Sequence, residues 1–199
     1  MAQANSAPSA DWAPRTIGGT AYGFEHLRPF EMHLRRPATA ALAPLEIPIR
    51  VVFDCHVVTQ ACSICFEHVA GHPAYWVDSG GHCRVFRADR HAQSLELPNF
   101  IRSLLSGRVK CYAAKSSNFM AWKAVADTTT QHYQVYFVVY RPRGADHLVL
   151  YVQSAYVKQS PLPAQRESRR VFATLCAQAF GAIAHHPKGR TSKSKKLKP

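Results

Sequence analysis

The chain has 199 residues, 47% of them hydrophobic, and this length suits one domain of ordinary size with tails. The composition excludes a wholly disordered chain, and no apolar run reaches the 18 residues of a membrane span. Lys and Arg number 25 against 12 Asp and Glu, a formal net charge of +13. A balance this basic favours a polyanionic partner, above all nucleic acid.

The positive charge is concentrated toward the C-terminus. Residues 1–50 sum to +1, 51–100 to −2, 101–150 to +5 and 151–199 to +9. Residues 188–199 hold six positive charges and no acidic residue, which leaves +7 of the +13 on the rest of the chain. We expect a phosphate-binding surface in the C-terminal half and a basic tail. The alternative is that the charge only keeps the protein soluble and the tail is a solvated end.

Residues 1–20 are rich in Ala, Ser, Pro and Gly, and we expect a flexible segment there. They lack the basic start and apolar core of a secretory signal, so the expected location is cytoplasmic. In that compartment the six cysteines are expected to be thiols or metal ligands rather than disulfides. The expected organisation is this flexible segment, a single domain over 21–186 and a disordered basic tail over 187–199.

The first clear element is residues 47–59, IPIRVVFDCHVVT, whose β-branched and apolar content predicts a largely buried strand. Prolines at 37, 44 and 48 argue against a long helix before it. Two shorter strands are expected at 75–77 and 83–87, separated by the turn Asp78-Ser-Gly-Gly81.

The second half predicts two helices around an antiparallel meander. The first, over 94–107, has Pro98 in its first turn and Gly107 just past its end. Strands are expected over 109–114, 119–125, 133–141 and 147–158, and a final helix over 167–184. In the last strand Leu150, Val152 and Ser154 alternate onto one face. The expected fold class is α+β, an antiparallel β-sheet meander with a helix before it and a C-terminal helix packed on it.

Cysteine and histidine are concentrated between residues 55 and 83. Zinc binds thiolates and neutral imidazoles in a tetrahedron, and a Cys-x2-Cys knuckle supplies two of them on one turn. The best quartet for a structural zinc is Cys62, Cys65, His82 and Cys83. Because adjacent strand residues point to opposite faces, His82 and Cys83 can both bind only if the Gly-Gly turn bends them together. The alternative is that the cysteines pack as small hydrophobic residues and no cofactor is bound.

Basic side chains with aromatic neighbours predict contacts to phosphates and unpaired bases. The nucleic-acid-binding candidates are Arg84, Arg90, Arg108, Lys115, Arg141, Arg143, Lys158 and, in the tail, Lys188, Arg190, Lys193, Lys195, Lys196 and Lys198. The alternative is that these are solvated strand ends, with Phe86 and Tyr112 in the core. If one face of the closing hairpin stays open, its polar and aromatic residues form a surface for a nucleic-acid strand, but most of its tyrosines are expected in the core with their hydroxyls at the rim: Tyr136, Tyr140, Tyr151 and Tyr156.

No motif of nucleophilic catalysis, phosphate cradling or dinucleotide binding occurs, and the carboxylates are scattered. Metal-free RNA cleavage needs only a base, an acid and a cation on the phosphate, because RNA supplies its own 2′-hydroxyl. For such chemistry the catalytic candidates are His91 as base or acid, Arg87, Arg102 and Lys110 on the phosphate, and Tyr112 as stacking residue or proton donor.

The helix followed by a meander, over residues 94–158, resembles the small ribonuclease fold of barnase and the RelE-type bacterial toxins in architecture, without a shared motif. The resemblance implies a metal-independent ribonuclease of toxin type. Two other hypotheses stay open: a non-catalytic module, with or without zinc, that binds an acidic protein, and a genome-packing structural protein of a virus or mobile element.

Overall fold

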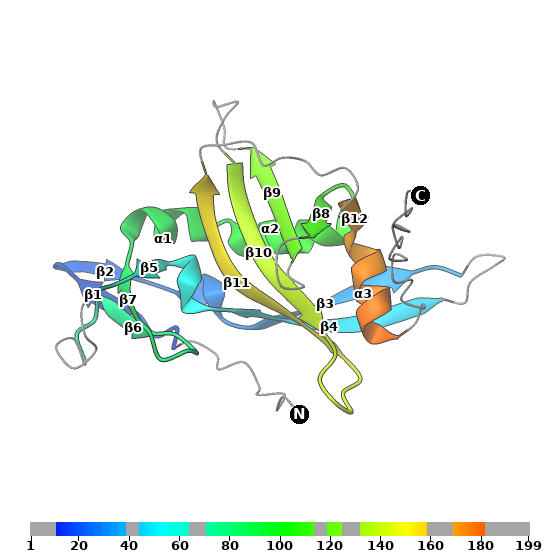
Figure 1. Cartoon of the computed structure of the whole chain (residues 1–199), viewed down its shortest axis with the longest axis horizontal. Coiled ribbons are helices and arrows are strands. Elements are labelled where there is room, and N and C mark those ends of the chain that lie inside the picture. Colours follow the sequence, from blue (N-terminus) through cyan, green and yellow to red (C-terminus); the bar gives the residue numbers. More distant parts are fainter. Residues whose placement is uncertain are drawn as a thin grey trace, which may run out of the picture.

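A seven-stranded sheet forms the centre of the protein (Figure 1). The computed structural model describes residues 11–38, 44–63, 71–113, 119–124, 132–158 and 169–181. Across the sheet the strands run β12 (Arg169–Val171), β8 (Lys110–Ala113), β9 (Phe119–Ala124), β10 (His132–Tyr140), β11 (Leu148–Lys158), β4 (Leu45–Phe53) and β3 (Phe30–Arg36). The four consecutive strands β8 to β11 are neighbours, so the predicted meander is confirmed.

One pair in this sheet is parallel. Strand β11 lies antiparallel to β10 on one side but parallel to β4 on the other, with Leu148 opposite Ile49 and Val152 opposite Phe53. Both strands of the parallel pair are apolar on the core side, as expected for strands in the middle of a sheet. The predicted α+β class is confirmed, with a single parallel pair among the described strands of the main sheet.

A β-bulge changes the faces of β11. Tyr136 lies opposite Ser154 and Phe137 opposite Val152, which leaves Gln153 without a residue opposite it. The alternation therefore shifts by one residue, and Ala155 joins Val152 in the core. The prediction that Ser154 shares a face with Val152 is wrong, because simple alternation takes no account of the bulge.

The remaining strands form two small sheets at one end of the molecule. Strands β5 (Thr59–Ala61), β7 (Cys83–Phe86) and β6 (Tyr75–Val77) form one sheet in that order, and β1 (Arg15–Ile17) and β2 (Thr20–Tyr22) form a hairpin. Trp12 is 4% exposed and its ring lies 6.0 Å from that of Phe24. The folded part thus begins before residue 21, because this tryptophan anchors a stretch predicted to be flexible.

The helices differ from their predicted bounds. In place of one helix over 94–107 there are α1 (Ala88–Ser94), α2 (Leu97–Ser103) and the 3-10 turn η4 (Leu104–Ser106). Gly107 follows at a φ of 69°, the left-handed conformation that ends a helix. Helix α3 (Phe172–Phe180) is shorter than predicted, because the residues before it continue the sheet as β12.

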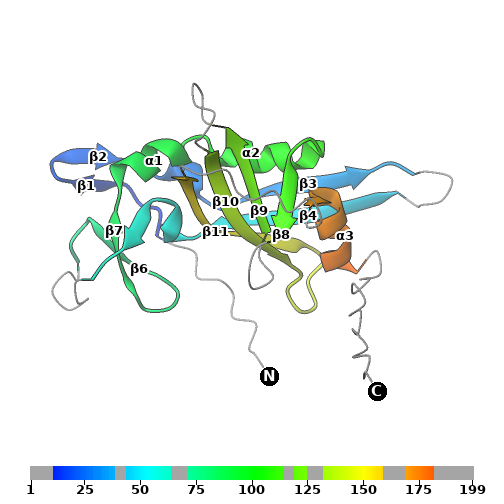
Figure 2. The same ribbon diagram turned by 45° about the horizontal axis from the view of Figure 1, so that its top comes forward.

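The helices and the sheet enclose one hydrophobic core. Phe172 of α3 packs edge-on against Phe137 of β10 at 6.2 Å, and Leu97, Ile101 and Leu104 are buried in the same cluster. Figures 1 and 2 both show α1 near the two small sheets and α3 near β8 and β12. No helix in the described part of the chain is both long and apolar enough to cross a membrane.

Candidate functional site

The seven-stranded sheet has two unlike faces. One carries the core, and we call the opposite one the outer face. Cys111 and Val135 point into the core, so their neighbours Tyr112 and Tyr136 point outward. Tyr112 lies opposite Arg169 on β12 and opposite Met120 on β9. Met120 in turn lies opposite Tyr136, so this row crosses four strands of the outer face.

Tyrosines line the middle of the outer face. The rings of Tyr136 and Tyr156 stack at 5.6 Å with an interplanar angle of 21°. The Tyr136 hydroxyl donates a hydrogen bond of 2.7 Å to Oε1 of Gln134, which holds the ring in place. Both tyrosines are half-buried and neither belongs to the core cluster. The prediction that most tyrosines of this hairpin lie in the core is therefore wrong for Tyr136 and Tyr156.

Strands β8 and β12 make one edge of the outer face strongly basic. A hollow of about 310 Å³ is lined by Arg108, Val109, Lys110 and Tyr112, and Arg169 lies opposite the tyrosine. The Lys110 Nζ donates to the carbonyl of residue 107 at 2.7 Å. Among the described residues no carboxylate forms an ion pair with these cations. Their charge is therefore available to an anion from outside.

Sequence reasoning missed Arg169 and its neighbour Arg170. Both were placed at the start of the final helix, whereas they belong to an edge strand. The signal that could have found them is the pair of arginines just before an apolar helical stripe, at the border of two elements.

A second polar group, which we call the His56 cluster, comprises Asp54, His56, Asp78, His82 and Tyr151. Asp54 follows β4, and its Oδ1 accepts a 3.0 Å hydrogen bond from the His56 backbone N–H, which caps the 3-10 turn η2 (Cys55–Val57). The Tyr151 hydroxyl donates to its other oxygen, Oδ2. Burial, and next the Asp54 contact, raise the pKa of Tyr151, so its hydroxyl stays a proton donor.

Asp78 anchors the turn between β6 and β7. Its Oδ1 accepts backbone N–H bonds of 2.9 Å from Gly80 and His82, and its Oδ2 accepts a 3.0 Å bond from Nε2 of His56. Burial raises the pKa of Asp78, but the hydrogen bonds from His82, His56 and Gly80 outweigh it, and the pKa falls to about 2. Asp78 is therefore a carboxylate at neutral pH.

Glycine is favoured at both positions of this turn. A Cβ on Gly80 would lie 2.8 Å from Nδ1 of His82, and Gly81 has a φ of 80°. The two glycines let the imidazole of His82 lie close against the backbone, where its Nδ1 is 3.2 Å from Oδ1 of Asp78.

Two arginines predicted to bind nucleic acid support this cluster instead of facing solvent. The Nε of Arg84 donates to Oγ1 of Thr59 at 3.0 Å, and its Nη1 lies 3.9 Å from Oδ2 of Asp78. The Nη1 of Arg90 donates to the carbonyls of His56, at 3.1 Å, and Thr59. Both guanidinium groups hold the segment from residue 54 to 59, and their role in binding stays a prediction.

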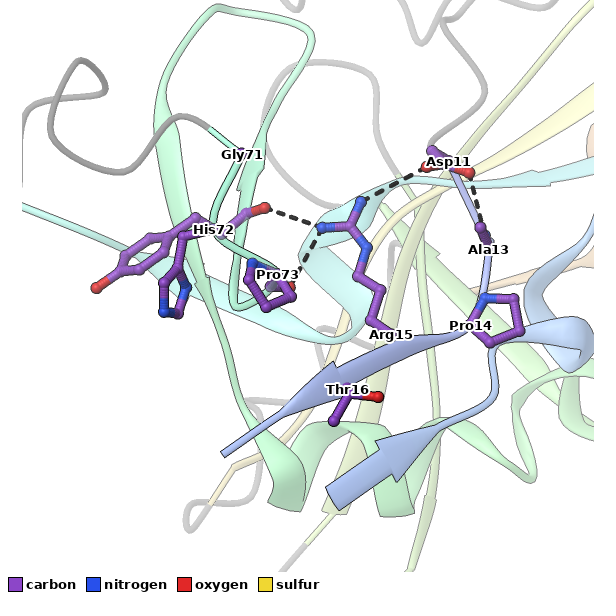
Figure 3. A pocket seen from close by; sticks show the side chains of 9 residues that line it. Asp11, Ala13, Pro14, Arg15, Thr16, Gly71, His72 and Pro73 are labelled. Atoms are coloured by element: carbon purple, nitrogen blue, oxygen red, sulfur yellow. Dashed lines mark hydrogen bonds and ion pairs between the residues drawn. The ribbon is translucent and has the colours of Figure 1, made fainter. Parts of the chain in front are cut away.

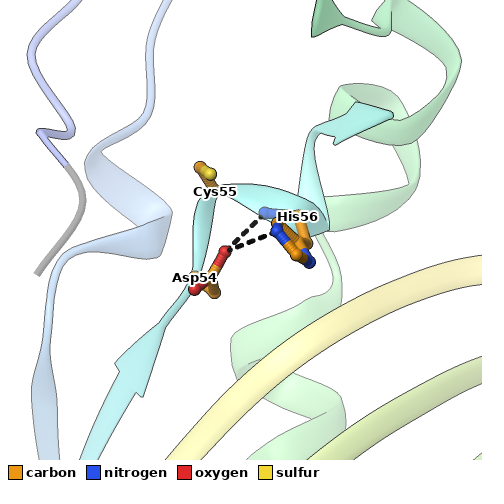
Figure 4. A group of neighbouring side chains, drawn as sticks. All are labelled: Asp54, Cys55 and His56. Atoms are coloured by element: carbon orange, nitrogen blue, oxygen red, sulfur yellow. Dashed lines mark hydrogen bonds and ion pairs between the residues drawn. The ribbon is translucent and has the colours of Figure 1, made fainter. Parts of the chain in front are cut away.

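Asp54, Cys55 and His56 form a group that could hold a metal ion, since their ligand atoms lie within 4.8 Å of one another (Figure 4). Figure 4 shows the Asp54 carboxylate aimed at His56, while the Cys55 thiol points to a different side. Burial, and next the Asp54 charge, raise the pKa of the Cys55 thiol to about 12. The group is compatible with a structural zinc, although the thiol must lose its proton to bind one.

The predicted zinc quartet is brought together only in part. The Cys62 backbone N–H donates to the Cys83 carbonyl at 3.2 Å, so these residues are cross-strand neighbours. Burial, and next the adjacent Cys62 thiol, raise the pKa of Cys83. The exposed ring of His82 points to Asp78 and not to the buried Cys83. Cys65 lies outside the described residues.

His91, predicted as a catalytic base or acid, lies in a cage of rings. Its Nε2 is 2.8 Å from the carbonyl of Gly23, and its ring is within 5.9 Å of those of Tyr22, Phe86 and His26. These contacts tie α1 to the N-terminal hairpin.

The other catalytic candidates are dispersed. Arg87 pairs with Asp89 at 2.9 Å, and Arg102 lies 4.2 Å over the ring of Phe30. The remaining two candidates are on β8, and Figures 1 and 2 both show β8 well apart from α1. The structure thus brings Lys110 and Tyr112 together but not with His91.

Of the remaining binding candidates, Arg141 is used within the fold, donating to the carbonyls of Ala145, at 2.7 Å, and Phe180, at 3.1 Å. Arg143 and Lys158 are exposed. Lys115 and the tail residues Lys188, Arg190, Lys193, Lys195, Lys196 and Lys198 lie outside the described residues.

A larger hollow of about 610 Å³ lies beside the N-terminal hairpin (Figure 3). Figure 3 shows the Arg15 guanidinium between Asp11 and the Pro73 carbonyl, at 3.7 and 3.3 Å. The same group donates to the Tyr75 carbonyl at 3.1 Å and lies 3.8 Å over the Trp76 ring. The donors of Arg15 are engaged in holding two segments together, so this guanidinium is not free to bind an anion in the hollow.

The fold and these sites define an α+β protein with a basic, tyrosine-lined sheet face and a separate histidine–carboxylate cluster. The chain belongs to the YjaZ family, whose model matches residues 14–180. No curated protein and no solved structure matches it. The family match covers both the outer face and the His56 cluster.

Proposed function

We propose that the protein binds single-stranded nucleic acid, RNA above all, on the outer face of its seven-stranded sheet. The observation that carries the proposal is the β8–β12 edge. There Lys110, Tyr112 and Arg169 share one face of two adjacent strands, and no described carboxylate neutralises the cations. Lys and Arg bind phosphate groups and release counterions, which supplies affinity without sequence specificity.

The tyrosines favour a single strand over a duplex. Stacking on an aromatic ring requires an unpaired base, and each stacked base contributes about 1–3 kcal/mol. Tyr112 and Tyr136 lie on one row of the outer face, and Tyr156 stacks on Tyr136. A strand that follows this row from Arg169 toward β11 would place phosphates at the basic edge and bases on the rings.

Fluorescence anisotropy with a labelled oligouridine tests the proposal. Replacing Lys110 and Arg169 together by Glu should weaken binding at least tenfold and lower the slope of log affinity against log salt by about 1–2, because each lost phosphate contact removes roughly 0.7 from that slope. Arg35→Glu is the matched control, since Arg35 is exposed on the strand at the other edge and paired with Glu46. Equal affinity of the double variant and the control would refute binding at this edge.

Three finer predictions are part of the proposal. A structural zinc at Asp54, Cys55 and His56 is tested by native mass spectrometry after zinc-replete expression, and a mass without zinc would refute it.

A contribution of the tail to binding is tested by deleting residues 188–199. A cytoplasmic location is tested by cell fractionation. An acidic protein as partner would bind the wild type more tightly than oligouridine does.

A further inference from the structure

Strand β3 forms one edge of the seven-stranded sheet and is paired on one side only. It runs for seven residues, Phe30–Arg36, against β4, whereas the strand at the opposite edge, β12, has three residues. Within the described part of the chain, no backbone hydrogen bond joins residues 30–36 to any segment other than β4. A long edge with unused backbone groups is a template for another strand.

Pro48 decides which backbone groups of β3 point outward. It lies opposite His33 in the antiparallel register of β3 and β4. Because proline has no N–H, these two residues cannot exchange two hydrogen bonds, and they form a non-hydrogen-bonded pair. In such a pair the N–H and C=O groups point away from the partner strand, and the pattern repeats at every second residue. Glu31, His33 and Arg35 therefore direct their backbone groups to the free side of β3.

The side chains of the same three residues are exposed on the outer face. Met32 and Leu34 belong to the core, so the residues that alternate with them lie on the opposite face. Glu31 forms no ion pair with any described residue, and Arg35 is 75% exposed and pairs with one oxygen of Glu46. A guanidinium has five N–H donors, so Arg35 keeps donors for a second carboxylate.

The sequence of β3 is complementary to itself when two copies run antiparallel. His33 is the middle residue, so pairing along the whole strand places it opposite its own counterpart. Glu31 then lies opposite Arg35 of the second copy, and on the core side Met32 lies opposite Leu34. A shift by two residues would place either Glu31 or Arg35 opposite His33 and the other opposite a proline. Only the central register matches opposite charges.

We propose that the protein forms a two-fold symmetric dimer through β3, in which the seven-stranded sheets of two copies join edge to edge. The backbone groups of Glu31, His33 and Arg35 make the hydrogen bonds between the copies. Because the same strand contributes from both copies, each match of opposite charges occurs twice. The two outer faces lie on the same side of the joined sheet, with the β8–β12 edges at its ends. This dimer does not depend on RNA binding.

Analytical ultracentrifugation of the full chain over a range of concentrations tests for the dimer, and charge reversal tests the interface. Glu31→Arg and Arg35→Glu should each raise the dimer Kd about tenfold or more, because each turns two attractive cross-strand pairs into repulsive ones. The variant with both reversals has opposite charges in every pair again and should dimerise like the wild type. Arg28→Glu is the control, since Arg28 is exposed but precedes β3, and it should leave the Kd unchanged.

Hydrogen exchange of single amides, followed by NMR, locates the interface. The amides of Met32 and Leu34 face β4 and should be protected at every concentration. Those of Glu31, His33 and Arg35 should become protected only as the dimer forms. His33→Pro removes a donor that β4 does not use, so it should abolish the dimer while circular dichroism keeps the signal of the folded chain.

A chain that stays monomeric at all concentrations would overturn this proposal. So would a dimer that keeps fast exchange at Glu31, His33 and Arg35, or one whose Kd does not change in Glu31→Arg. If the double reversal failed to restore the dimer, the central register would be wrong. A short oligouridine binds a single copy, so its affinity for Arg35→Glu should equal that for the wild type; the dimer and the RNA surface can therefore fail separately.

Discussion

Arginine side chains have different roles at the two ends of this protein. At the β8–β12 edge, Arg108 and Arg169 lie on a surface with no described carboxylate paired to them. Around the turn η2, Arg84 and Arg90 direct their guanidinium groups at Thr59 and the backbone beside it. Only the fold distinguishes the two pairs of arginines.

The difference shows what makes a cation available to a ligand. A buried carbonyl or hydroxyl must find a hydrogen-bond donor, and a nearby arginine that satisfies it stabilises the fold. Among the described residues, Arg108 and Arg169 form no ion pair at the β8–β12 edge, so their charge is available to solvent or phosphate. A group of basic residues in the sequence therefore predicts a binding surface only where those side chains are not already used as donors to carbonyl and hydroxyl groups of the fold.

The largest expected effect is in the His56 cluster. Asp78→Ala leaves the N–H groups of Gly80 and His82 and the ring of His56 without their acceptor, and should lower the free energy of unfolding by about 3 kcal/mol. Urea unfolding measures it, with Asp146→Ala as control because Asp146 is 99% exposed. Equal losses in both variants would show that the cluster is not a stabilising centre.

The next effect belongs to the outer face. Tyr112→Leu keeps apolar bulk but removes the ring on which a base would stack, and should weaken oligouridine binding about tenfold. Tyr75→Leu, a half-buried tyrosine of the small sheet, should leave the affinity unchanged. Fluorescence anisotropy compares the two variants. An equal loss of oligouridine affinity in both would show that binding does not distinguish the outer face from the small sheet.

Arg90→Ala should cost about 1–2 kcal/mol of unfolding free energy, because the carbonyls of His56 and Thr59 lose a charged donor. Because its guanidinium also lies 5.3 Å over the ring of Tyr156, RNA affinity should fall, but by less than in the Lys110 and Arg169 double variant. Arg87→Ala, which removes an exposed ion pair with Asp89, should cost about 0.5 kcal/mol or less. If Arg90→Ala weakened RNA binding as strongly as the Lys110 and Arg169 double variant, the assignment of Arg90 to the fold would be wrong.

The smallest expected effect is a pH dependence. The pKa of Asp78 is about 2 in the folded protein, against an ordinary value of 3.8. Because the folded pKa is depressed, its contribution to stability is complete above about pH 4 and is lost as the pH falls through about 2. Urea midpoints between pH 5 and pH 2 should therefore fall less in Asp78→Asn than in the wild type; identical slopes would contradict this origin.

The strands of the meander are predictable from the sequence, because the alternation of apolar and polar residues and the turn residues between strands are visible within a few neighbouring positions. Residues 109–114 and 133–141 were expected as strands, and the structure has them at Lys110–Ala113 and His132–Tyr140. The strand over Arg169–Val171 was not, because three residues carry no period and are held only by pairing with β8. The bulge at Gln153 is not predictable from the sequence either, because it is defined only by the pairing of β11 with β10.

Of the candidate site, Lys110, Tyr112 and Arg108 were identified because basic and aromatic residues are close in sequence there. His56 and Asp78 are 22 residues apart, and His56 was noticed only as part of a cysteine–histidine region. Asp54 and Tyr151 are 97 residues apart. No local pattern links either pair.

The sequence by itself determined that the protein is α+β, basic toward its C-terminus, and built on four consecutive strands between helices. These properties depend on composition and on short-range periodicity, both of which can be seen in short segments of the sequence. Only the tertiary structure decided that β4 pairs in parallel with β11, that Arg169 joins Lys110 and Tyr112, and that Asp78 orients His56 and His82. Those contacts join distant segments, and they form because burial of the core brings together groups that must then satisfy one another's hydrogen bonds.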